Sequence, residues 1–158
     1  MTTAFDLAVA SVLSEEGGYT NDSRDPGGET KYGICKRSYP ALDIRNLTRE
    51  QAIHIYQTDY WDACRCSDLP SRIAVAVFDS AVNSGVGFAA RTLQRALRVT
   101  DDGRVGPNTV AAAYTVADES LLLMHFYGHR LKMLADLATW DVFGRGWARR
   151  VARDLTGA

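Results

Sequence analysis

Residues 3–16 and 17–33 read TAFDLAVASVLSEE and GGYTNDSRDPGGETKYG, and the change of pattern between these two stretches decides the fold at the N-terminus. In the first stretch Phe5, Val9 and Val12 recur at helical spacing, which predicts a helix with one apolar face. The second stretch holds five glycines and a proline and has no helical period. Because a long loop within a compact domain is usually functional, we expect the functional site in residues 17–33.

Beyond this loop, helical periodicity and helix signals continue along most of the chain. Thr48 and Gln51 form a capping-box pattern at the start of one helix, and Gly85 is typical of a helix end. Residues 31–38 allow one short strand. The pattern therefore predicts an all-α, mainly helical fold. The further helices are expected over residues 48–61, 70–85, 88–97, 107 onward, 119–138 and 147–155.

Length and charge predict one domain over residues 1–158. The chain has 18 basic and 19 acidic side chains, and this net charge of −1 argues against a nucleic-acid partner held by phosphate contacts. No run approaches the roughly 18 apolar residues of a membrane span, so no stable membrane insertion is expected. The N-terminus lacks a basic region and Asp6 interrupts its apolar stretch, so no signal peptide is expected either.

The cysteines and histidines predict no metal site and no cofactor. Cys35, Cys64 and Cys66 are an odd number, and a single C-x-C pair is too little for a paired zinc motif. We expect reduced thiols, while a bridge from Cys35 to either of the other two stays open. His125 and His129 lie four residues apart with no third ligand nearby in the sequence.

Glu16 lies at the boundary between the first predicted helix and the loop. On a helical wheel with Phe5 at zero, Glu16 falls at about 20° on the apolar face, whereas Glu15 falls at about −80°. Residues 15–32 hold five acidic and two basic side chains, a local net charge of −3. Burial and like charges both raise a carboxyl pKa, as a general acid for glycosidic cleavage requires. The alternative is that Glu16 only caps a frayed helix end.

Short motifs spread over most of the chain carry a family resemblance. The N-terminal ones are Glu16-Gly-Gly-Tyr19, Asp25-Pro-Gly-Gly28 and Thr30-Lys-Tyr-Gly-Ile34. Together they resemble the signature of glycoside hydrolase family 108, phage and bacterial N-acetylmuramidases with a lysozyme-like fold. The resemblance continues through FDSAVN at 78–83, and LQRAL at 93–97 and DGRVGPNT at 102–109 are similar to the family's C-terminal peptidoglycan-binding region.

This resemblance implies one lysozyme-like domain made of two halves. Residues 1–85 would form the catalytic half, with Glu16 and the loop 17–33. Residues 86–158 would form a peptidoglycan-binding-like half that is not an independent domain.

The resemblance also implies catalytic roles for three residues. In this family the glutamate of the first motif is the catalytic acid, which corresponds to Glu16. A looser comparison with phage-type lysozymes adds Asp25, at the same eight-residue separation from the glutamate, and Thr30, at a separation one residue shorter than in those enzymes. Asp25 would stabilise positive charge or activate water, and Thr30 would hold that water. Asp25 is also an ordinary turn residue before a proline.

A second group of residues are candidates for contact with the glycan. The aromatic residues of the loop could stack on sugar rings or hold the loop against the core. The polar pair one helical turn apart could face the substrate or the solvent. These alternatives stay open. The substrate-binding candidates are Tyr19, Tyr32, Gly33, Asp79 and Asn83.

The implied function is hydrolysis of the β-1,4 bond between N-acetylmuramic acid and N-acetylglucosamine in bacterial peptidoglycan, by a monomeric phage or prophage endolysin. Such an enzyme would wait in the host cytoplasm until it is released to the cell wall. Two alternatives stay open: a lytic transglycosylase, which forms 1,6-anhydro ends, and a non-catalytic peptidoglycan-binding protein. The basic stretch 144–158, with a net charge of +3, is either a solvated face or a surface for anionic envelope polymers.

Overall fold

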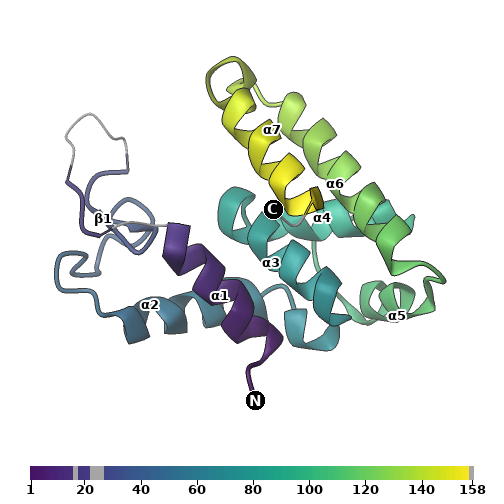
Figure 1. The fold of residues 1–158 in the computed structure, drawn as a ribbon, viewed down its shortest axis with the longest axis horizontal. Coiled ribbons are helices and arrows are strands. Elements are labelled where there is room, and N and C mark those ends of the chain that lie inside the picture. The colour runs from purple at the N-terminus through teal and green to yellow at the C-terminus, as the bar shows by residue number, and fades with distance from the viewer. Residues whose placement is uncertain (16–17, 22–26, 157–158) are drawn as a thin grey trace. The chain divides into compact units, whose positions relative to one another are not determined.

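The computed structural model describes residues 1–15, 18–21 and 27–156. The chain divides into two compact units, Met1–Trp61 and Asp62–Ala158. Helices are the main regular structure in both units, and the one small sheet found among the described residues lies in the first (Figure 1), so the expected mainly helical fold is confirmed. Within the described part of the chain, no helix combines the length and the apolar character needed to cross a bilayer.

The first unit packs its helices around a small apolar core. Val9 and Val12 on α1 are 4% and 5% exposed, and the Phe5 ring meets Trp61 edge-on with the centroids 5.3 Å apart. The apolar face predicted for this helix is therefore confirmed. The elements of the unit are α1 (Ala4–Glu15), β1 (Thr30–Lys31), β2 (Ile34–Cys35), α2 (Arg49–Tyr56) and a π-helical turn (Gln57–Asp62) that continues α2.

The start of α2 forms as the sequence predicts. The Gln51 backbone N–H donates to the Thr48 hydroxyl at 3.2 Å, and the Thr48 N–H donates to Oε1 of Gln51 at 2.9 Å. This reciprocal pair satisfies two backbone donors that a helix start otherwise leaves without partners. The capping box is confirmed.

The short β-element expected near residues 31–38 is present, as an antiparallel hairpin of two two-residue strands. Thr30 pairs with Cys35 and Lys31 with Ile34. The two turn residues, Tyr32 and Gly33, both have a positive φ, 52° and 76°. Such a turn matches the twist of the strands that it joins, and it reverses the chain near the start of the expected β-element.

The second unit is a cluster of helices in which α3 packs against α4 and α6, and α6 packs against both α4 and α7. A loop of four residues, 136–139, joins α6 to α7, and the two helices run side by side in Figure 1. Gly85 has φ 93° between α3 and α4, which confirms the predicted helix end there. The elements are a 3₁₀ turn (Cys66–Asp68), α3 (Ser71–Ser84), α4 (Val86–Leu97), α5 (Pro107–Thr115), α6 (Glu119–Ala135) and α7 (Trp140–Thr156).

The last helix begins seven residues earlier than the sequence predicts, at Trp140 rather than Trp147. Two glycines, Gly144 and Gly146, weaken the helical pattern in this stretch. In the structure the Trp140 ring occupies the space that a Cβ at Gly144 would need. Ring packing on the glycine therefore offsets the low helix propensity.

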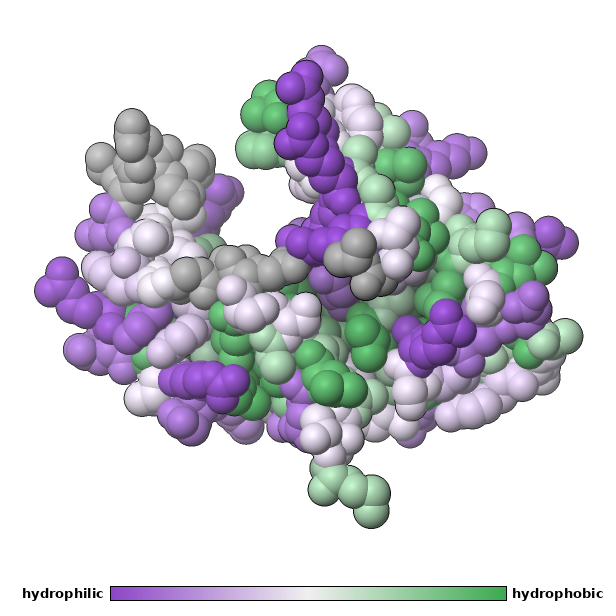
Figure 2. All heavy atoms as spheres, viewed as in Figure 1, coloured by the Kyte–Doolittle hydropathy of each residue, from purple (hydrophilic) through white to green (hydrophobic). Residues whose placement is uncertain are grey.

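Hydrophilic side chains gather along α7 in Figure 2, at the top of the view. Arg145, Arg149 and Arg153 are exposed and lie four residues apart, so they form one basic stripe along the helix. Cys35, Cys64 and Cys66 are free, as expected, and the last two are fully buried.

Candidate active site

The candidate site of the first unit begins where α1 ends, at Glu15. The buried face of this helix is the one toward which the helical wheel directs Glu16. Glu16 and Asp25 themselves lie outside the described residues. Their catalytic roles therefore stay predictions.

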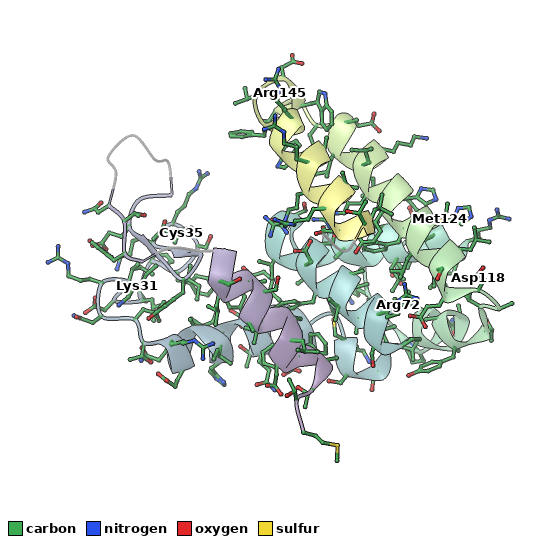
Figure 3. All side chains as sticks on the ribbon, in the orientation of Figure 1. Lys31, Cys35, Arg72, Asp118, Met124 and Arg145 are labelled. Carbon is green, nitrogen blue, oxygen red and sulfur yellow. The ribbon has the colours of Figure 1, made fainter. Side chains whose placement is uncertain are left out.

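The backbone of Thr30 is held from both sides. On one side it pairs with Cys35 across the hairpin, whose strands are marked by Lys31 and Cys35 in Figure 3. On the other side it forms a β-bridge with Thr20, in which the two N–H groups donate to the opposite carbonyls at 2.8 and 2.9 Å. The Thr30 hydroxyl donates to the Gly28 carbonyl at 3.3 Å, which leaves its oxygen lone pairs open to accept.

Tyr19 is fixed by a carboxylate and a cation. Its hydroxyl donates to Oε1 of Glu29 at 2.6 Å, and the Arg45 guanidinium lies 5.3 Å from the centroid of its ring. A hydrogen bond to a carboxylate and a cation–π contact both restrict the ring to one position. Glu29 is thus a carboxylate beside the candidate site that the motifs did not single out.

The hairpin turn at Tyr32 and Gly33 is anchored from beneath. The hydroxyl of Tyr56, which is 2% exposed, donates to the Tyr32 carbonyl at 2.8 Å. The ammonium group of Lys31 donates to the Arg45 carbonyl at 3.0 Å and lies 5.5 Å from the centroid of the Tyr32 ring. These contacts hold the turn while Gly33 stays exposed and the Tyr32 side chain half-buried.

Asp79 and Asn83 lie on α3, in the second unit, and both side chains have protein partners. Oδ2 of Asp79 lies 2.9 Å from Nη1 of Arg130, and its Oδ1 lies 3.4 Å from Nη2 of Arg150. The Asn83 amide donates to the Asp79 carbonyl at 2.7 Å. The same Arg130 nitrogen pairs with Asp154 at 3.0 Å, so two carboxylates share one buried guanidinium.

This cluster joins α3, α6 and α7. Arg130 is 1% exposed, which makes the ion pairs largely inaccessible to water. Burial, and next the negative charge of Asp79, raise the pKa of Asp154 to about 6. The sequence analysis missed Arg130 because its partners lie 51 and 24 residues away in the chain, and no local pattern marks it.

Of the six described candidates, four belong to the first unit and two to the second. Tyr19, Thr30, Tyr32 and Gly33 belong to one framework in the first unit, tied by the Thr20–Thr30 bridge and the hairpin. Asp79 and Asn83 belong to the helical cluster of the second unit. In the described ranges, no group of three or more His, Cys, Asp and Glu side chains is placed to hold a metal ion.

Comparison with known proteins assigns the two parts of the chain. Residues 9–85 match the model of the family described as glycosyl hydrolase 108, and residues 88–152 match a predicted peptidoglycan domain. Among solved structures, the chain is similar to one titled "Structure of Brucella abortus SagA", with 33% identity and a TM-score of 0.86, over 96% of this chain and 91% of that one. No similar sequence was found among curated proteins.

The first family match makes the chain a glycoside hydrolase, and the second makes peptidoglycan its substrate partner, so the chain is a peptidoglycan-degrading enzyme. The solved relative is similar over nearly the whole length at 33% identity, which extends the relationship across both matched regions. The chain belongs to the glycosyl hydrolase 108 family.

Proposed function

We propose that the enzyme hydrolyses the β-1,4 bond between N-acetylmuramic acid and N-acetylglucosamine, with Glu16 as the general acid. The observation that carries this proposal is the Thr20–Thr30 bridge within the region matched by the hydrolase family. Thr20 follows Glu16 by four residues and Thr30 follows Asp25 by five. The bridge thus pairs a residue four positions after one candidate carboxyl group with a residue five positions after the other.

The chemistry needs one proton donor, one negative charge and one water molecule. Glu16 protonates the glycosidic oxygen as the bond breaks. Asp25 stabilises the oxocarbenium-like transition state or activates the attacking water. Thr30 orients that water, because its hydroxyl already donates a hydrogen bond to the Gly28 carbonyl and its oxygen can therefore accept a hydrogen bond from the water. These groups and water suffice, so no metal or cofactor enters the proposal.

The hairpin turn and Tyr19 are proposed as glycan contacts. The ring faces of Tyr19 and Tyr32 opposite the Arg45 and Lys31 cations would stack on sugar rings, and Gly33 would let a glycan approach the backbone closely. Asp79 and Asn83 remain proposed contacts through the lone pairs that their protein partners leave open. A glycan hydroxyl would donate to them.

Product analysis tests the reaction. Purified peptidoglycan is digested with the full chain, and the released muropeptides are analysed by mass spectrometry after borohydride reduction. We expect reducible N-acetylmuramic acid ends. Anhydro ends would instead identify a transglycosylase, and the absence of soluble fragments a binding protein.

A pair of variants tests the acid. Glu16→Gln keeps the shape of the side chain but has no acidic proton, so we expect turnover to fall by about 10²-fold or more. Its neighbour Glu15, about 100° away on the wheel, supplies the matched control. Glu15→Gln is expected to stay active, and equal losses in both variants would remove Glu16 from the mechanism.

The biological role that fits this reaction is that of a phage or prophage endolysin. The enzyme would accumulate in the host cytoplasm and reach the wall at lysis. Expression in a bacterial host, with and without a co-expressed membrane pore protein, tests this role. Lysis that depends on the pore supports it, and lysis at the same time without a pore contradicts it.

A further inference from the structure

The second unit contains an open pocket between the end of α4 and the start of α5, in the region matched by the peptidoglycan domain. Its volume is about 660 Å³, within the range of small-ligand sites. It includes none of the candidate site residues described above. The residues that decide its chemistry are Gln94, Arg98, Asp102, Arg104, Gly106 and Asn108.

The wall of the pocket is held in place by Gln94, which is 1% exposed. Its amide nitrogen donates to Oδ1 of Asp102 at 2.8 Å, to the Arg104 carbonyl at 2.9 Å and to the Thr109 hydroxyl at 3.2 Å. Its amide oxygen accepts from the Gly103 N–H at 3.0 Å. Both the nitrogen and the oxygen of the buried Gln94 amide are hydrogen-bonded to the loop and to α5. These bonds fix the wall of the pocket without a ligand, so the pocket is preformed.

The charged side chains that line the pocket, Arg98, Arg104 and Asp102, have a positive net charge. Arg98 and Arg104 are exposed, and neither forms an ion pair with another described residue, whereas nearby Arg95 pairs with Asp101 at 2.7 Å. The acid in the lining, Asp102, accepts from Gln94 and from the Arg104 N–H, and these hydrogen bonds lower its pKa. These donors are neutral, so Asp102 keeps its negative charge, and the two guanidinium groups exceed it by one positive charge that favours an anion.

The start of α5 contributes backbone donors to the same pocket. Gly106 at the helix start has no side chain to cap it, so the first-turn N–H groups receive no side-chain cap. The positive end of the helix favours a negative group here. A Cβ at Gly106 would meet no atom within 4 Å, which shows that the pocket is open at this point.

Arg98 occupies a position where glycine is the usual residue. It follows the last turn of α4 with φ 58° and ψ 37°, the left-handed conformation that glycine adopts without strain. An arginine in this conformation costs stability relative to glycine. Arginine at residue 98 instead places a guanidinium group at the pocket.

We propose that this pocket binds a free carboxylate of a peptidoglycan stem peptide. The proposal rests on the proposed function, since it takes peptidoglycan as the substrate. Guanidinium groups form paired hydrogen bonds with a carboxylate, and helix N–H groups add further donors. In peptidoglycan the stem peptides carry free carboxylates and extend from the glycan, so the pocket holds the stem while the first unit acts on the sugars.

Two substitutions separate binding from folding. Arg98→Gly removes the guanidinium and relieves the backbone, and Gly106→Asp supplies a helix cap whose own carboxylate occupies the anion position. Both variants are expected to keep or raise the melting temperature and to bind the stem peptide about tenfold more weakly or worse. A residue with a purely structural role would not lose binding while the fold gains stability.

Each variant has a matched control. Arg65 is another exposed arginine in the left-handed conformation, with φ 50° and ψ 38°, and it does not line the pocket. Arg65→Gly repeats the loss of charge and the relief of strain elsewhere. Gly106→Ala adds a methyl group without a cap or a charge. Both controls are expected to bind as the unsubstituted chain does.

The measurement is isothermal titration calorimetry of the full chain with the synthetic peptide L-Ala-γ-D-Glu-L-Lys-D-Ala as the free acid, and with the fully amidated peptide. We expect the free acid to bind about tenfold more tightly or better. Equal binding of both peptides, or unchanged binding in Arg98→Gly and Gly106→Asp, overturns the proposal. Inorganic phosphate is the competitor. If phosphate displaces the peptide at equal concentration, the proposal is also overturned, because the pocket would then bind any anion and not the stem peptide in particular.

Peptide binding is measured without cleavage of any bond. A chain that binds the free acid but releases no reducible ends contradicts the muramidase proposal and leaves the pocket assigned. A chain that releases reducible ends but does not bind the peptide contradicts only the pocket.

Discussion

The hydroxyl of Tyr19 donates a 2.6 Å hydrogen bond to Oε1 of Glu29, and so joins the two ends of the loop that lies between them. Thr20, which follows Tyr19, pairs through its backbone with Thr30, which follows Glu29. The Arg45 guanidinium covers the Tyr19 ring. The base of the loop is therefore closed by a side-chain contact and a backbone bridge at once.

Tyr19→Phe removes the hydroxyl and keeps the ring beside Arg45. We expect the free energy of unfolding to fall by about 1 kcal/mol, the usual contribution of one hydrogen bond. Hydrolysis of peptidoglycan should also slow, because the base of the loop that carries Asp25 is loosened. Urea denaturation and a turbidity assay on purified cell walls measure the two effects. Tyr114→Phe, at a residue that is 63% exposed, is the control, and equal stability losses in both would contradict the prediction.

Thr30→Val keeps the shape and the strand propensity of the side chain and removes its hydroxyl. If Thr30 orients the water, the rate of hydrolysis should fall about tenfold, which corresponds to about 1.4 kcal/mol. Thr30→Ser, which retains the hydroxyl, should restore most of the rate. Steady-state hydrolysis of purified walls gives the result. Equal rates in the valine and serine variants would show that the hydroxyl has no part in the reaction.

Arg130→Met leaves the carboxylates of Asp79 and Asp154 partly buried without their shared cation. Removing one partner of a buried ion pair typically costs about 3–5 kcal/mol of stability, so we expect a large drop in the free energy of unfolding. Arg72→Met is the control, because the Arg72 side chain is 63% exposed and lies 3.8 Å from Glu119. The control should change stability by less than about 1 kcal/mol. Denaturant titration compares the two variants, and a small loss at Arg130 would contradict the prediction.

The pH dependence of stability should change in Asp154→Asn. Folding raises the pKa of Asp154 from its ordinary value of 3.8 to about 6, so in this window the folded protein holds a proton that the unfolded chain has released. The contribution of Asp154 is therefore fully present below pH 3.8 and is lost as the pH rises through about 6. Relative to Asp154→Asn, the unsubstituted chain should lose stability between pH 4 and pH 7 in urea titrations. A constant difference across this range would rule out the raised pKa.

Local patterns in the sequence were enough for features that depend on neighbouring residues. The buried face of α1 follows from the spacing of Phe5, Val9 and Val12, and the capping box follows from Thr48 and Gln51 three residues apart. Both arise from hydrogen bonds and side-chain directions within one or two helical turns, which sequence spacing encodes directly.

The same local view was wrong where packing overrides propensity. The last helix was expected from residue 147, but α7 begins at Trp140, whose ring packs on Gly144. The short β-element near residues 31–38 was predicted correctly, but its hairpin form depends on the tertiary structure, because Tyr32 adopts a positive φ beside Gly33 and Tyr56 donates to its carbonyl.

The sequence by itself determined the helical class, the ends of most helices, and the family motifs that mark Glu16, Asp25 and Thr30 as catalytic candidates. The tertiary structure alone decided which distant groups meet: Tyr19 with Glu29, Asp79 with Arg130, and Gln94 with the loop that lines the pocket of the second unit. The physical reason is that periodicity and capping act over a few residues. Ion pairs and buried amides depend instead on where separate helices and loops come to lie against one another.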